Sequence, residues 1–127
     1  MKQSTDSINA IYEYGCMALR NRSWLIYEVG ERVSDSTLHL RIVQNSEEGT
    51  FSREWICSKD IVEVLKIKPQ LAGVDLKEFM KFGDSNTGGF VLAICVDLGL
   101  VRKKDARTYE YVVNFDLRSA VEKRLGN

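Results

Sequence analysis

The sequence of 127 residues contains one proline, one histidine and three cysteines, and its formal net charge is zero. Cys16, Cys57 and Cys95 are odd in number and widely spaced, so they indicate reduced thiols rather than a disulfide framework. With His39 as the single imidazole and no C-x-x-C pair, the chain has too few ligands for a structural zinc site. We therefore expect neither a metal nor another cofactor.

Long apolar runs are also missing from the chain. No stretch of about 18 apolar residues occurs, and the start, MKQSTDSINA, has no apolar run behind its lysine. We therefore expect no membrane-spanning helix, no secretory signal, no membrane contact and a cytoplasmic location. A content of 44% hydrophobic and 28% charged residues predicts one globular domain over residues 1–127.

Charge of either sign is not in excess, but it is unevenly distributed. Residues 1–60 hold seven basic and nine acidic side chains, and residues 61–127 hold eleven and nine. So small an excess predicts modest attraction to phosphates that salt screens easily. Nucleic-acid binding would require the basic side chains to share one face.

Spacing of apolar residues changes along the first half of the chain. Ile8, Ile11, Cys16 and their neighbours follow one another at intervals of three and four, which predicts a helix over residues 5–20. From Trp24 the period becomes two, which predicts strands over residues 24–56, arranged as a hairpin or meander that ends with FSREWI.

Helical spacing returns in the second half. CSKDIVEVL predicts a helix from Ser58, and Pro69, whose φ suits the first turn of a helix, predicts a second one up to about Lys81. A third helix is expected over residues 90–98. Gly99 ends it, LVRK and TYEYVVNF pair as strands around a polar tip, and a last helix covers residues 117–125.

Two stretches resemble a known superfamily. DIVEVLKIKPQLAGVDL resembles the bacterial helix-turn-helix, with these aliphatic and small residues at the buried positions: Ile61, Val62, Leu65, Ile67, Ala72 and Leu76. It departs from the pattern at Lys66, where glycine is usual, and by carrying Gly73, Asp75 and Glu78 on its second helix. LGLVRKKDARTYEYVVNF resembles the helix end and wing of winged-helix domains. Together the stretches cover roughly half the chain.

The resemblance implies an α+β fold, a winged-helix-like domain with an N-terminal helix and an additional β-hairpin or meander. The helix-turn-helix and wing would occupy residues 58–116. Two assignments of the recognition helix stay open. It is either the helix that Pro69 begins, which has the better marked start, or the following one, which would present Asn86 and Thr87 to base edges.

The resemblance also implies double-stranded DNA as the partner. A glutamine such as Gln70 can read adenine, and basic wing residues can hold phosphates, although a charged hairpin tip can equally be a solvated turn. The candidate contacts are Lys68, Gln70, Lys77, Asn86, Thr87, Arg102, Lys103, Lys104 and Arg107. The leading hypothesis is a non-catalytic DNA-binding protein that regulates transcription or serves as an accessory factor, as a homodimer because such proteins commonly read paired half-sites.

The alternative is a protein-protein interaction module, an inhibitor or adaptor, on a winged-helix scaffold that does not bind DNA. Neutral net charge and the acids of the expected recognition helix favour it. Five aromatic residues of the predicted strands either pack internally or form a contact face: Trp24, Tyr27, Trp55, Tyr109 and Tyr111.

Catalytic patterns are weak in this sequence. The acidic residues lie in turns, without the spacing of an acid–base pair, and GDSNTGG lacks the lysine of a nucleotide-binding loop. A pair of Cys57 and His39 across neighbouring strands stays open. We expect a protein that acts by binding.

Overall fold

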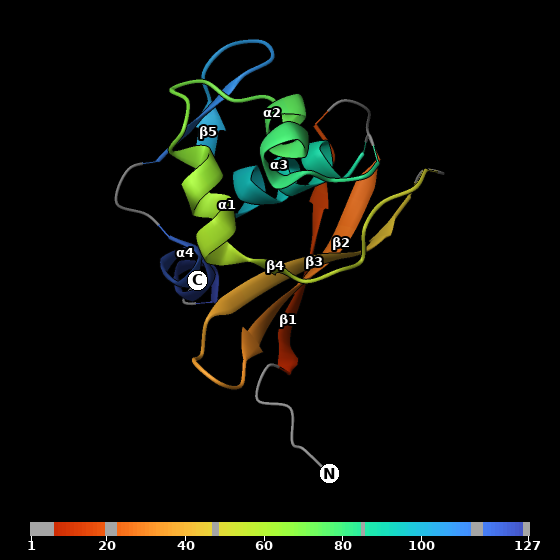
Figure 1. The fold of residues 1–127 in the computed structure, drawn as a ribbon, viewed down its shortest axis with the longest axis vertical. Helices are drawn as coiled ribbons and strands as arrows, with labels where there is room; N and C mark the ends of the chain where they lie inside the picture. Colours follow the sequence, from red (N-terminus) through yellow and green to blue (C-terminus); the bar gives the residue numbers. More distant parts are fainter. Residues whose placement is uncertain (1–6, 20–22, 47–48, 85, 113–115, 126–127) are drawn as a thin grey trace.

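The computed structural model describes residues 7–19, 23–46, 49–84, 86–112 and 116–125. A curved antiparallel sheet lies against helices, and a two-stranded hairpin lies at one end of the molecule (Figure 1). The sheet contains β1 (Ile8–Met17), β2 (Trp24–Arg32), β3 (Leu38–Asn45) and β4 (Ile56–Cys57), in that order. The other elements are α1 (Ser58–Leu65), α2 (Gly73–Met80), α3 (Thr87–Leu98), β5 (Val101–Lys103), β6 (Tyr109–Tyr111) and α4 (Leu117–Leu125). The α+β class is confirmed.

The N-terminal segment is a strand, so the predicted N-terminal helix is wrong; residues 5–6 and 20 of that range lie outside the described residues. β1 pairs with β2 along its whole length, and the register shifts between Ala10 and Tyr12. Ile11 is therefore an extra residue, a β-bulge. The extra residue shifts the alternation of side chains by one position. Apolar residues before and after the bulge are therefore separated by intervals of three and four, as in a helix.

Alternation along β2 and β3 is as predicted, and it separates a core face from a face turned away from the helices, here called the outer face. The buried core row consists of Leu25, Tyr27, Val29, Leu38, Leu40 and Ile42. The predicted strand FSREWI is mostly wrong, because β4 contains only Ile56 and Cys57. Phe51 instead packs edge-on against Phe90 of α3, with 6.2 Å between ring centroids.

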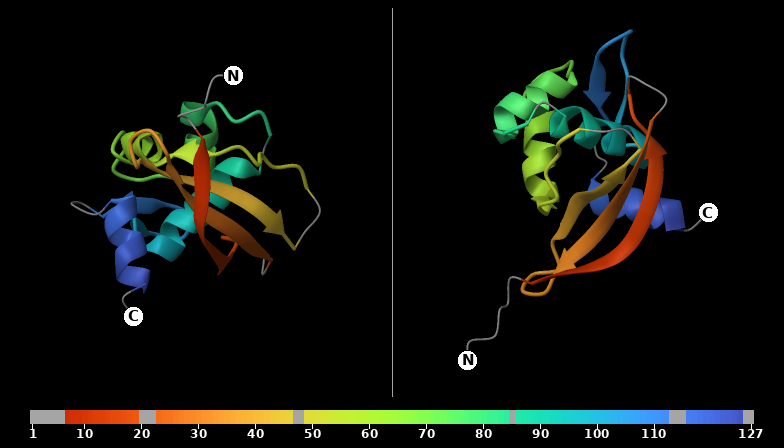
Figure 2. Two further views of the ribbon diagram at one scale, coloured as in Figure 1. Left: turned by 90° about the horizontal axis from the view of Figure 1, so that it is seen from below. Right: turned by 90° about the vertical axis from the view of Figure 1, so that its right-hand side faces the viewer.

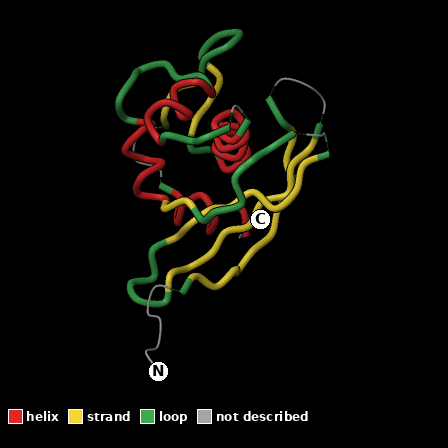
Figure 3. Tube along the Cα trace, turned by 45° about the vertical axis from the view of Figure 1, so that its right-hand side comes forward, coloured by secondary structure: helices red, strands yellow, loops and turns green. Residues whose placement is uncertain are grey.

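The helices gather on one side of the sheet, and α3 lies at the centre of the core (Figures 2 and 3). It contacts α2, β1, β5 and α4. Its fully buried apolar side chains are Val91, Leu92, Ile94 and Cys95. The helix is apolar nearly all round, as expected for a helix covered on several sides.

The segment 66–72 between α1 and α2 is longer than predicted, and α2 begins at Gly73 rather than Pro69. Leu71 explains the delay, because its N–H and C=O both bond to Tyr109 of β6, at N···O distances of 2.7 and 2.8 Å. That bridge requires extended backbone. Asp75 then starts the helix by accepting the Ala72 N–H at 2.8 Å.

Glycines allow α2 and α3 to touch through their backbones. A Cβ added at Gly88 would lie 2.5 Å from the carbonyl oxygen of Gly73 and 2.9 Å from the backbone nitrogen of Lys77. Gly73, which departs from the helix-turn-helix pattern, therefore has a packing role.

The C-terminal elements confirm their predictions. Gly99 ends α3 in the left-handed region, at φ 80°, and β5 pairs antiparallel with β6 around the polar tip. Helix α4 has the predicted limits. Residues 113–115 of the predicted second strand lie outside the described residues.

Candidate interaction surfaces

One end of the molecule combines the 66–72 segment with the β5–β6 hairpin; it is called the basic end below. The bridge between Leu71 and Tyr109 holds the two together, and they lie side by side in Figure 1. The Thr108 hydroxyl donates to the Gln70 side-chain oxygen at 3.4 Å. Lys68 and Gln70, far from the hairpin in sequence, thus lie beside it in the fold.

Several cations of the basic end are already paired. Lys68 contacts Asp75 at 2.8 Å; burial alone would raise the pKa of Asp75, but Lys68 and the Ala72 amide outweigh it and lower that pKa. Arg102 and Lys104 contact Glu110 at 3.1 and 3.3 Å. Bonds from Arg102 and then Lys104 lower the pKa of Glu110. These pairs cancel charge that a phosphate would otherwise meet.

Four cations in or beside the basic end form no ion pair with any residue that the structure describes. They are Lys66, Lys77, Lys103 and Arg107. Of the predicted DNA contacts, the hairpin residues, Lys68 and Gln70 are thus brought together. The sequence-based list of DNA contacts did not include Lys66. The available signal was its position in the turn, where the helix-turn-helix pattern usually has glycine.

The start of α3 is covered by the loop that precedes β4. Asn86 donates to the Thr50 carbonyl oxygen at 2.8 Å, and the Thr87 hydroxyl accepts the Ser52 N–H at 2.9 Å. The Asp84 carboxylate accepts hydrogen bonds from the backbone N–H groups of Asn86 and Thr87 and from the Thr87 hydroxyl. Thr87 is fully buried, so in this arrangement its side chain anchors the loop and has no exposed atom for a base.

Helix α2 and the 66–72 segment before it present apolar side chains to solvent. Val74 is 58% exposed, Phe79 44% and Ile67 54%, so the predicted burial of Ile67 is wrong. Leu76 and the partly buried Met80, four residues apart, form the inward side of α2. The spacing of Leu76 and Met80 defines the inward side of the helix, and it could have predicted that Val74 and Phe79 lie on the exposed side.

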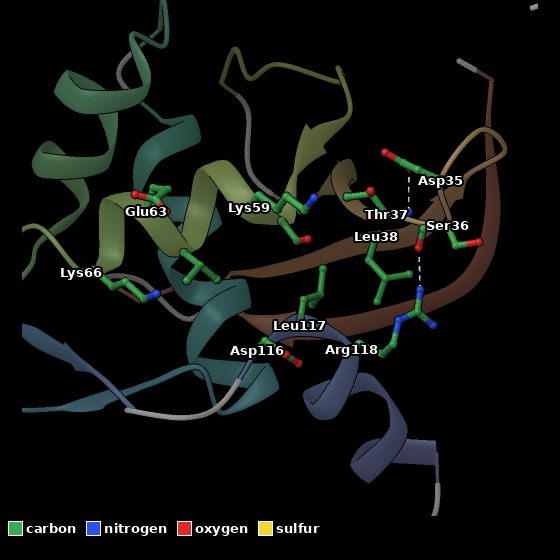
Figure 4. Close-up of a pocket in the computed structure, with 12 residues that line it drawn as sticks. Asp35, Ser36, Thr37, Leu38, Lys59, Glu63, Lys66, Asp116, Leu117 and Arg118 are labelled. Atoms are coloured by element: carbon green, nitrogen blue, oxygen red, sulfur yellow. Dashed lines mark hydrogen bonds between the residues drawn. The ribbon is translucent and has the colours of Figure 1, made fainter. Parts of the chain in front are cut away.

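A groove of about 490 Å³ lies between α1, the β2–β3 turn and the start of α4 (Figure 4). Arg118 on its rim is bound to the Ser36 carbonyl oxygen at 2.6 Å and to Glu31 at 3.0 Å. Lys59, Glu63 and Lys66 also line it, with no ion pair to a described residue. Charges of both signs leave the groove without preference for one ligand class.

A polar cluster under β2 joins the sheet to α3 and α4. The Tyr27 hydroxyl donates to Asp97 at 2.7 Å, and Arg124 contacts the same carboxylate oxygen at 3.1 Å. Arg124 also lies over the Tyr14 ring, 4.5 Å from its centroid. Burial, then the bond to Asp97, raises the pKa of Tyr27, so the phenol stays a donor. The cluster anchors α4 against the sheet.

His39 and Cys57 are direct partners in the β3–β4 register, as the open catalytic hypothesis required. Their side chains form no hydrogen bond with each other, and His39 Nδ1 lies 3.1 Å from the Thr37 carbonyl oxygen. Burial raises the pKa of Cys95 to about 12, which makes its thiol unreactive. Within the described ranges no three His, Cys, Asp or Glu side chains come together as a metal site.

The predicted aromatic face is divided between core and surface. Tyr27 and Tyr109 are buried, Trp24 is exposed, and Trp55 is half-buried with the Arg41 guanidinium 4.3 Å from its ring centroid. In the part of the chain that the structure describes, no helix has the length and apolar character to cross a membrane. No family model, curated protein or solved structure matches this chain.

Proposed function

We propose that the chain is a non-catalytic protein-interaction module on a winged-helix-like scaffold, which presents α2 and the residues before it to a protein partner. The order of elements supports the scaffold: α1, the extended bridge at Leu71, α2, α3 and the β5–β6 hairpin follow the winged-helix order of helix, strand, helix, helix and wing. The bridge between Leu71 and Tyr109 takes the place of the short strand in that order.

The observation that carries the proposal is the exposure of Ile67, Val74 and Phe79, while the start of α3 is covered. A winged-helix protein reads bases with the first turn of an exposed helix, and of the two candidate recognition helices α3 has a first turn that holds the loop before β4. Burial of exposed apolar and aromatic side chains against a protein partner stabilises the complex, whereas phosphates make no favourable contact with such side chains.

A photo-crosslinking phenylalanine analogue at position 79 tests this proposal. In a lysate of the source cells, we expect illumination to attach one protein to position 79. The same analogue at Val33, which is 55% exposed in the β2–β3 connection, is the matched control and should capture none. Val74→Ser should reduce the yield at position 79, while Val33→Ser should not.

Equal capture at positions 33 and 79, or none at either, would contradict the assignment of α2 as the contact surface. Thermal unfolding of each variant shows whether the fold is retained. Val74 and Val33 are largely exposed, so we expect their replacement by serine to change the free energy of unfolding by no more than about 0.5 kcal/mol.

The four cations in or beside the basic end that form no ion pair with a described residue favour a second candidate function, contact with DNA phosphates. The β5–β6 hairpin would supply Lys103 and Arg107, and Lys66 would add to them from the neighbouring segment. Counterion release makes such binding fall steeply with salt. Base-specific contact through Gln70, the remaining exposed candidate reader, belongs to the same hypothesis.

Retention on random duplex DNA between about 50 and 200 mM salt tests this second function. Lys103→Ala/Arg107→Ala should flatten the dependence of log K on log salt by about two, near one for each lost phosphate contact. Arg53→Ala/Lys59→Ala makes the same change of charge elsewhere and should leave the slope unchanged. Absence of binding at the lowest salt would eliminate the DNA function and leave the interaction module.

A further inference from the structure

β1 forms a long free border of the sheet. It pairs with β2 on one side, and along the other side no described strand is bonded to it (Figure 2). The opposite border, β4, is two residues long and leads directly into α1. An edge strand presents unpaired N–H and C=O groups, which can bind a further strand.

The sequence of β1 does little to prevent such pairing. INAIYEYGCM contains one charged residue, Glu13, and neither lysine nor proline, the residues that commonly protect edges. The bulge at Ile11 is a protective irregularity, but beyond it the strand continues regularly to Met17. The stretch from 12 to 17, directly after the bulge residue, is therefore available as a straight edge.

Apolar side chains border this edge on the outer face. Met17 and Trp24 are direct partners in the β1–β2 register, and they are 56% and 43% exposed. Ile11, the bulge residue at the other end of this stretch, is 40% exposed. Burial of these side chains would add to the backbone bonds that a new strand forms.

We propose that β1 pairs antiparallel with β1 of a second copy, with the two-fold axis at Tyr14. In this register Ile11 faces Met17 of the second copy, and Glu13 faces Gly15, each contact occurring twice. An axis at Glu13 would place two carboxylates opposite each other, which is unfavourable. An axis at Gly15 would leave Ile11 without a partner in the strand.

Its apolar ends and its single carboxylate thus match β1 to a second copy of the same strand in one register. The two sheets join into one, and α2 and the basic end take no part in the seam. This inference therefore does not depend on the proposed function.

Position 15 tests the register directly. The Gly15 backbone accepts a side chain, since an added Cβ would lie 3.6 Å from the Leu25 carbonyl oxygen, an ordinary contact. Gly15→Lys places an ammonium opposite Glu13 of the second copy, and Gly15→Glu places a carboxylate there. Gly15→Ser is the neutral control of similar backbone effect.

Sedimentation equilibrium up to about 1 mM protein, a range suited to a small interface, measures the dimer Kd. We expect Gly15→Lys to lower the Kd about fivefold and Gly15→Glu to raise it about fivefold, from two cross-strand charge pairs in each dimer. Gly15→Ser should stay near wild type. Glu13→Lys combined with Gly15→Glu should restore dimerisation.

Two outcomes would overturn the proposal. A wild-type chain and a Gly15→Lys variant that are both monomeric at every concentration would show that no second copy binds this edge. A dimer whose Kd is equal in the Lys, Glu and Ser variants would place the contact elsewhere. Melting temperatures of the variants confirm folding, and the tightening by lysine cannot arise from misfolding.

Discussion

Replacement of Gly88 by alanine probes the contact on which the position of α2 depends. The added Cβ would lie 2.5 Å from the Gly73 carbonyl oxygen and 2.9 Å from the Lys77 backbone nitrogen. Both are backbone atoms, so relief requires α2 and α3 to separate. Overpacking of this kind costs roughly 1–3 kcal/mol or more, and the higher helix propensity of alanine returns up to about 1 kcal/mol.

We therefore expect Gly88→Ala to lower the free energy of unfolding by about 2 kcal/mol. For a chain of this length that corresponds to a melting temperature lower by about 8 °C. Gly89→Ala is the matched control in the same turn, because no atom lies within 4 Å of its added Cβ. It should raise the free energy of unfolding by up to about 1 kcal/mol.

Thermal and urea unfolding, followed by far-ultraviolet circular dichroism, measures both changes. Equal effects of the two alanines would refute the close approach of α2 to α3. The contact also bears on the proposed function, since it fixes the helix that exposes Val74 and Phe79. Gly88→Ala should consequently reduce photo-crosslinking at position 79 under conditions in which the protein is still folded.

Three further predictions concern single side chains. Tyr27→Phe removes the hydroxyl that donates to Asp97 and should lower stability by about 1–2 kcal/mol in urea unfolding; an unchanged midpoint would contradict that bond. Burial alone would raise the pKa of Asp84, but hydrogen bonds from the start of α3 outweigh it and lower that pKa. The stability that Asp84 contributes is therefore fully present above the unfolded-state pKa near 4 and is lost as the pH falls through the folded-state pKa. Asp84→Asn should therefore flatten the loss of stability between about pH 5 and pH 2, and an unaltered acid profile would exclude this role. Alkylation of the native protein, followed by mass spectrometry, should modify the partly exposed Cys57 and spare the buried Cys95 until urea is added; early labelling of Cys95 would contradict its burial.

Local patterns in the sequence determined much of the fold. Alternation identified β2 and β3, helical spacing identified α1, α3 and α4, and the polar tip between apolar runs identified the β5–β6 hairpin. Gly99 was predicted at the end of α3, where φ is positive. These elements are recognisable because one face of each is buried, and burial imposes the period of the backbone on the sequence.

Only the tertiary structure decided the remaining features. The bulge at Ile11 made a strand look helical, and the bonds of Leu71 to Tyr109, 38 residues away, delayed α2 beyond Pro69. Likewise, no local pattern shows that a loop 35 residues upstream covers Thr87, or that Gly73 and Gly88 join two helices. The sequence by itself determined which faces are apolar; contacts between distant segments decided which of them are covered and which remain exposed to a partner.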